Sequence, residues 1–166
     1  MSNVLTRAAT IASAALLATT GALVGATQAS ALPAATPTCR VADLDLAVGA
    51  RERAGGSVNY PILFTNTTGH TCALRGYPGV SVTDARHRQI GTSAIRTGEP
   101  ISTVFLGPDD TVTAIMRTNS RSASPNCRQT SAYVKVYPPN SGVAVEIPYN
   151  LRVCGMFEIS PVEASD

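Results

Sequence analysis

The sequence predicts an all-β protein, an immunoglobulin-like antiparallel β-sandwich of about eight or nine short strands with two disulfides. Apolar and polar residues alternate with a period of two in many short segments, and Gly, Pro, Asn and Asp punctuate them. No long stretch after residue 31 has a sustained helical period. The four cysteines form an even set in a chain that begins like an exported protein, where cysteines usually pair as disulfides. The chain has no Trp, so it lacks the usual core marker of antibody domains.

The first 31 residues have the pattern of a cleaved signal peptide. Arg7 is followed by an apolar stretch over 8–24 and by the small residues Ala29-Ser30-Ala31, which predicts cleavage after Ala31. The alternative is an uncleaved membrane anchor. The stretch is rich in Ala, Thr and Gly, which insert poorly into a bilayer, so we expect no membrane span after cleavage. Pro37-Thr38 before the first cysteine disfavours a lipid anchor.

The remainder predicts a linker over 32–38, a single domain over 39–162 and a C-terminal tail over 163–166. Once Arg7 is removed, 12 basic residues face 11 acidic ones. This near balance argues against nucleic acid as a partner, because that function needs a clustered positive excess. Residues 51–100 hold six Arg against three acids, which we interpret as an ordinary solvated surface.

The first pair of predicted strands suggests one disulfide. A strand near 41–49 is followed by a turn over Arg51–Gly56 and by a return strand over 58–64, in which Pro61 indicates an edge or a bulge. A further turn at Asn66-Thr67-Thr68-Gly69 reverses the chain before a short strand begins near Cys72. Cys39 and Cys72 should therefore lie at the same end of an antiparallel pair, as a disulfide requires.

The same construction recurs near the C-terminus. Cys127 precedes a strand around 130–137, a Pro-Pro-Asn-Ser-Gly turn follows at 138–142, and Val143, Val145 and Ile147 alternate along the return strand before Cys154. We therefore favour the pairs Cys39–Cys72 and Cys127–Cys154, with a nested pairing as the alternative.

The middle of the chain predicts further strands separated by turns. They are strands near 80–83, 89–91, 101–106 and 111–116, with turns at Asp84–His87 and Gly107–Asp110.

Several motifs resemble those of an actinobacterial family of secreted proteins and lipoproteins that contain a domain of unknown function. They are Cys39, Leu63-Phe64-Thr65-Asn66-Thr67-Thr68-Gly69, Cys72, Leu74, Gly76-Tyr77-Pro78-Gly79-Val80, Val104-Phe105-Leu106, Cys127, Pro138-Pro139 and Cys154. The resemblance spans roughly Cys39 to Val162 and implies a sandwich fold, an extracytoplasmic location and no catalytic residues. Two features depart from the family: the Gly107-Pro108-Asp109-Asp110 turn, where Pro-Gly is common, and the absence of a lipid-attachment signal.

The residues predict no enzyme, no cofactor and no metal site. There is no Gly-x-Ser-x-Gly motif, and no cysteine pair has the Cys-x-x-Cys spacing of a zinc or redox site. His70 near Cys72 is one imidazole beside a cysteine expected in a disulfide. Asp84 and His87 form the only acid–histidine proximity, and a turn-forming Asp explains it more simply than a catalytic triad.

Three other polar motifs have structural interpretations that we prefer. Asp109-Asp110 suggests a turn rather than a calcium site, which needs six or more oxygen ligands. Asn66-Thr67-Thr68 matches a glycosylation sequon, yet Asn also favours turns. Tyr77 is expected to face the core with its hydroxyl bonded to backbone, rather than to present its ring to a sugar.

The polar segment 117–127 is the predicted functional loop. Loops on a rigid scaffold commonly carry binding residues, although a flexible connector without a partner is the simpler interpretation. We expect a secreted, monomeric and non-catalytic module, extracellular or associated with the cell envelope, that binds a protein or cell-wall ligand through its loops. The alternative is a secreted protease inhibitor acting through 117–127.

Overall fold

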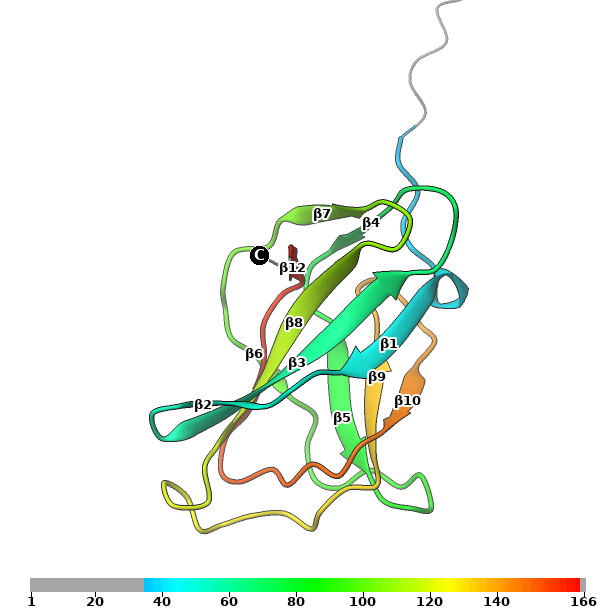
Figure 1. The fold of residues 1–166 in the computed structure, drawn as a ribbon. Coiled ribbons are helices and arrows are strands. Elements are labelled where there is room, and N and C mark those ends of the chain that lie inside the picture. Colours follow the sequence, from blue (N-terminus) through cyan, green and yellow to red (C-terminus); the bar gives the residue numbers. More distant parts are fainter. Residues whose placement is uncertain (1–34, 165–166) are drawn as a thin grey trace, which may run out of the picture. The chain divides into compact units, whose positions relative to one another are not determined.

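The computed structural model describes residues 35–164. The predicted signal peptide with its cleavage site at Ala31, residues 32–34 of the predicted linker, and residues 165–166 lie outside the described residues. The described part is all-β, with twelve strands, a single 3-10 turn (Val41–Asp43) and no α-helix (Figure 1). No helix within residues 35–164 has the length and apolar character needed to cross a membrane.

The strands form two facing sheets and a separate two-stranded ribbon (Figure 1). The larger sheet has the order β1 (Leu44–Val48), β3 (Ser57–Asn66), β8 (Thr111–Asn119), β11 (Phe157–Ile159), β6 (Ile95–Arg96), with β2 (Glu52–Ala54) paired to β3 and β12 (Glu163–Ala164) paired to β8. The second sheet has the order β10 (Val145–Pro148), β9 (Tyr133–Tyr137), β5 (Gly79–Thr83). The ribbon pairs β4 (Cys72–Arg75) with β7 (Thr103–Leu106). All named strand pairs are antiparallel except β6 with β11.

The core lies between the two sheets and follows from the alternation of the two longest strands. Every second residue of β3 and of β8 is buried, so one face of each strand is packed, and it is apolar except at Asn66 and Thr118. Phe64, Ile62 and Met116 from this sheet are fully buried, as are Val82 and Val134 from the opposite one. The sequence therefore specified the sandwich by placing its apolar residues on one face of each strand.

The predicted turn over 51–56 is partly wrong. Residues Glu52–Ala54 extend the first strand as β2, and the reversal is confined to Gly55 and Gly56, with Gly55 at φ +58°. Three residues, 49–51, separate β1 from β2 opposite only two residues of β3, so the strand bulges there.

Pro61 lies opposite this bulge, within a strand that has neighbours on both sides. The edge interpretation is therefore wrong and the bulge interpretation is correct. Its carbonyl accepts from the Gly49 N–H at 2.8 Å, on the side where the ladder is already interrupted.

The strand count differs from the prediction mainly because short strands were missed. β6, β11 and β12 have two or three residues each, too few to show a period. The expected return strand at 89–91 is reduced to a single bridge between Thr83 and Gln89. Backbone pairing also extends beyond the predicted domain limits, from Pro37, whose carbonyl accepts from Ala73 N–H, to Ala164 in β12.

Both favoured disulfides are present, Cys39–Cys72 and Cys127–Cys154, which excludes the nested pairing. The Cys39 N–H donates to the Ala73 carbonyl at 3.0 Å, which ties the entry of the domain to β4. Cys127 and Cys154 form an antiparallel bridge flanked by the Arg128 N–H to Val153 carbonyl bond (2.8 Å). Each disulfide thus reinforces a backbone contact between segments far apart in the sequence.

Candidate functional site

Asn66 and Tyr77, two polar residues of the segment 64–80, have structural roles. Asn66 is completely buried, and its Nδ2 donates to the carbonyls of His70, Leu106 and Gly107 at 2.8–3.0 Å. Its Oδ1 accepts from the Thr68 backbone N–H at 3.0 Å, as the turn interpretation predicted. The Tyr77 hydroxyl donates to a backbone carbonyl, that of Glu99, and its half-buried ring packs against the core, so the expected role of this tyrosine is confirmed.

Asp84 forms a turn, as the sequence favoured, and its carboxylate accepts from the backbone N–H groups of Arg86 and Arg88. Asp84 accepts from the Arg88 backbone N–H at 3.0 Å and from the Arg88 guanidinium at 2.7 Å, and these bonds hold the pKa of its carboxyl below the ordinary value. The acidic partner of His87 is instead Glu146, and the imidazole stacks on the ring of Tyr133. The sequence could not show this partner, because 59 residues separate the two side chains.

Asp109 and Asp110 form a turn, as the sequence indicated. Asp109 has a φ of +62°, and Asp110 Oδ2 accepts from the Gly107 N–H at 2.8 Å. Among residues 35–164, no group of three or more His, Cys, Asp or Glu side chains is placed to hold a metal ion.

The segment 117–127 is more ordered than a flexible connector. Its first three residues belong to β8, and residues 121–123 form a tight turn in which the Ser120 carbonyl accepts from the N–H groups of Ala123 and Ser124. The Ser120 N–H donates to the Gly56 carbonyl at 2.8 Å, which links this loop to the β2–β3 hairpin.

Gly155 lies in close contact with Asn119 and Ser124 of the same loop. It has a φ of +61°, and a Cβ on this residue would lie 2.7 Å from Asn119 Nδ2 and 2.8 Å from Ser124 Oγ. Only glycine fits this approach without displacing the loop. Its N–H donates to the Asn126 carbonyl at 2.9 Å, so the loop is fixed at both ends.

These contacts frame a groove whose charged lining is entirely basic. We call it the arginine groove; it has a volume of about 310 Å³. It is lined by Arg51, Arg53, Val58, Tyr60, Thr118, Asn119, Ser120, Arg121, Ser122, Arg152 and Cys154. The β2–β3 hairpin and the loop after β8 that border it lie at the lower left of Figure 1. The four arginines come from three separate segments of the chain.

The strand register explains which charged side chains reach the groove. Arg53 is paired across the hairpin with Val58, which is buried, so Arg53 shares the inward-facing side of β3. Glu52 is paired with Asn59 and therefore lies on the opposite face. The alternation thus places Glu52 on the face opposite to that of Arg53.

The groove arginines are exposed and are not neutralised by the fold. Ion pairs among the described residues join Arg40, Arg88, Arg117, His87 and Lys135 to acids, and none includes a groove arginine. Arg152 makes one side-chain hydrogen bond, from Nε to Thr130 Oγ1 at 3.0 Å, which leaves its terminal NH groups available. The groove therefore presents guanidinium donors to solvent.

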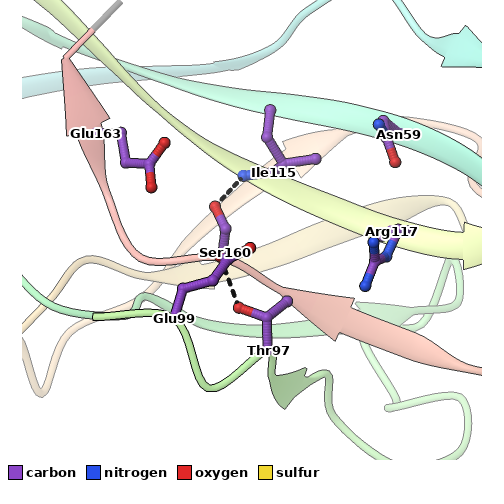
Figure 2. Close-up of a pocket in the computed structure, with 7 residues that line it drawn as sticks. All are labelled: Asn59, Thr97, Glu99, Ile115, Arg117, Ser160 and Glu163. Atoms are coloured by element: carbon purple, nitrogen blue, oxygen red, sulfur yellow. Dashed lines mark hydrogen bonds between the residues drawn. The ribbon is translucent and has the colours of Figure 1, made fainter. Parts of the chain in front are cut away.

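A second hollow, here called the outer pocket, lies on the outer face of the same sheet and has a volume of about 210 Å³ (Figure 2). It is lined by Asn59, Thr97, Glu99, Ile115, Arg117, Ser160 and Glu163. Arg117 is neutralised by Glu158, with Nη2 2.6 Å from Oε2, and two further carboxylates, Glu99 and Glu163, line the wall. Figure 2 shows the Ser160 hydroxyl bonded to the Ile115 backbone N–H, at 2.8 Å.

Only one wall of the arginine groove was predictable from the sequence. Arg121 lies in the predicted functional loop, whereas Arg51 and Arg53 were interpreted as a solvated surface and Arg152 was not considered. The two arginines of the short segment 51–53 were a usable signal of local positive charge. Arg152 reaches the groove through the tertiary structure, and no local sequence pattern indicated its position there.

Comparison with known proteins identifies a family and no established activity. The model of a domain of unknown function (DUF4232) matches residues 39–163, close to the limits of the predicted domain. Neither the curated proteins nor the solved structures contain a significant match to this chain. Because the matched region covers most of the sequence, the chain belongs to the DUF4232 family of domains of unknown function.

Proposed function

We propose that this protein is a secreted, monomeric and non-catalytic module of actinobacterial type, which binds a component of the cell envelope through the arginine groove. The observation that carries the proposal is the set of four exposed arginines in one groove, without an acidic partner in the ion pairs of the described residues. Guanidinium groups without an acidic partner have the donor geometry that binds carboxylates or phosphates of another molecule. The two disulfides and the signal-like N-terminus support an extracytoplasmic location.

The order of the groove also supports a binding role. The backbone bonds at Gly56 and Asn126 hold the loop in place before any ligand arrives. A preformed site binds at a smaller entropic cost than a loop that must be ordered on binding.

Protease inhibition remains the second candidate, and the conformation of the loop disfavours it. A substrate-like inhibitor presents an extended segment that pairs with the edge of the protease cleft. Residues 121–123 instead form a tight turn, in which the N–H groups of Ala123 and Ser124 donate to the Ser120 carbonyl.

A binding experiment with the oxidised protein beginning at Leu32 separates these functions. We expect it to sediment with purified cell walls at low ionic strength and to leave trypsin-like and subtilisin-like proteases active. A control variant with Arg75→Gln and Arg86→Gln loses two exposed arginines outside the groove and should still bind. Failure of the parent protein to bind cell walls would reject the proposal, and stoichiometric protease inhibition would favour the alternative.

A further inference from the structure

We propose that the arginine groove binds the phosphodiester groups of a polyol or sugar polymer that carries no nucleobases. This inference rests on the proposed function and specifies its ligand class. Three properties of the groove lead to it: the kind of donors, their number and the lack of an exposed aromatic surface.

The first property is the chemistry of the donors. Besides the guanidinium groups, the lining includes the hydroxyls of Ser120 and Ser122, whose oxygens are 2.9 Å apart. Only one hydroxyl proton is used in the bond between them, so one O–H remains available whichever serine donates. Arginine forks combined with a hydroxyl donor suit the several oxygens of a phosphate group.

The second property is the arrangement of the positive charge. Four arginines from the β2 segment, the loop after β8 and the segment before Cys154 line one open groove. A single carboxylate is planar and satisfies one guanidinium fork, whereas a tetrahedral phosphate accepts from donors on several sides. One phosphodiester neutralises one charge, so four arginines are matched by a ligand that repeats its phosphates along a chain.

The third property argues against nucleic acid. Proteins that bind single strands combine basic grooves with aromatic side chains on which the bases stack. The one aromatic residue lining this groove is Tyr60, which is only 8% exposed and is in edge-to-face contact with Tyr149. A polymer of phosphate and polyol needs no stacking surface and fits a groove with a polar rim.

The test measures affinity with defined anionic probes. A synthetic glycerol-phosphate oligomer is titrated into the oxidised protein, and a galacturonate oligomer and a single-stranded DNA of the same charge serve as comparisons. We expect the glycerol-phosphate oligomer to bind at least tenfold more tightly than either, with an affinity that falls as salt is added. Equal affinity for the carboxylate polymer or tighter binding of DNA would overturn the assignment.

Matched variants locate the site. The pair Arg53→Gln and Arg121→Gln should weaken glycerol-phosphate binding about 100-fold, since a hydrogen bond from a charged donor contributes roughly tenfold in affinity. The pair Arg75→Gln and Arg86→Gln removes the same charge elsewhere and should change the affinity less than threefold. Equal losses in both variants would show nonspecific attraction and overturn the site. All four residues are exposed, and the thermal midpoint checks that each variant is folded.

The outcome remains separable from that of the proposed function. Binding to cell walls that the groove variant does not weaken would reject this ligand site while the binding module stands. Tight, arginine-dependent binding of the oligomer without retention on any cell-wall preparation would support the ligand class and reject the proposed role at the envelope.

Discussion

The arginine groove and the outer pocket flank the same strand, β8, and are built in similar ways. In each, a buried hydroxyl completes the backbone bonding where regular pairing stops. Thr118 Oγ1 accepts from the Cys154 N–H at 2.9 Å beside the groove, and Ser160 Oγ accepts from the Ile115 N–H at 2.8 Å beside the pocket. Both side chains are at most 8% exposed. The two hollows thus share one structural device.

The arginine groove and the outer pocket differ in whether their arginines form ion pairs with acids. Arg117 in the outer pocket is bonded to Glu158 by two nitrogens, at 2.6 and 3.1 Å, so its charge is balanced within the molecule. The four groove arginines take part in none of the ion pairs of residues 35–164. The absence of acidic partners from the groove is what the proposed binding role requires.

Removal of the disulfides should have the largest effect and should separate stability from binding. The variants Cys127→Ser/Cys154→Ser and Cys39→Ser/Cys72→Ser each lose a cross-link over a similar sequence separation, 27 and 33 residues. We expect each to lose about 3 to 4 kcal/mol of unfolding free energy, measured by urea denaturation. Cys154 lines the groove, so only the first variant should also lose affinity for the glycerol-phosphate oligomer.

The control is the oligomer affinity of the second variant under conditions where circular dichroism shows that it is folded. An equal loss of binding in both variants would mean that the groove depends on global stability and not on its local cross-link.

Removal of the two hydroxyls should have an intermediate effect. Thr118→Val leaves the buried Cys154 N–H without its acceptor, and Ser160→Ala does the same to the Ile115 N–H. An unsatisfied buried donor costs about 1 to 3 kcal/mol, so both variants should have similarly lowered urea midpoints. Thr118→Val should also weaken oligomer binding, because Thr118 lines the groove and positions the segment that carries Arg152. If Ser160→Ala weakened binding equally, the two hollows would be coupled through β8.

The sandwich was predictable because its information is local. Val58, Tyr60, Ile62 and Phe64 repeat every second residue, and this period alone places them on the buried face of β3. Both disulfides followed from the order of cysteines and strands. The short strand β11 was not predictable, because three residues are too few to show an alternation of apolar and polar side chains. Its pairing with β6 and β8 is fixed by tertiary contacts.

The candidate site was less predictable for the same reason. Arg121 was found through its loop. Arg152 reaches the groove because the Cys127–Cys154 disulfide and the hydroxyl of Thr118 hold the chain at Cys154, two residues after it. Charge neutralisation is also a property of the folded state. No local pattern distinguishes Arg117, whose partner is 41 residues away, from an arginine without one.

The substitution Glu158→Gln should have the smallest effect on stability and gives the sharpest comparison. It frees Arg117 from an ion pair that is partly accessible to solvent, with side chains 44% and 20% exposed. Pairs in contact with solvent contribute about 1 kcal/mol or less, so the urea midpoint should move little. The outer pocket would then hold an unpaired arginine of its own. We expect no binding of the glycerol-phosphate oligomer there, because Glu99 and Glu163 line the same wall and repel phosphate. The measurement is oligomer affinity in the background of Arg53→Gln and Arg121→Gln, where the groove is disabled. Restored binding would mean that any free arginine on this sheet suffices, whereas no binding would show that one free arginine beside Glu99 and Glu163 does not suffice.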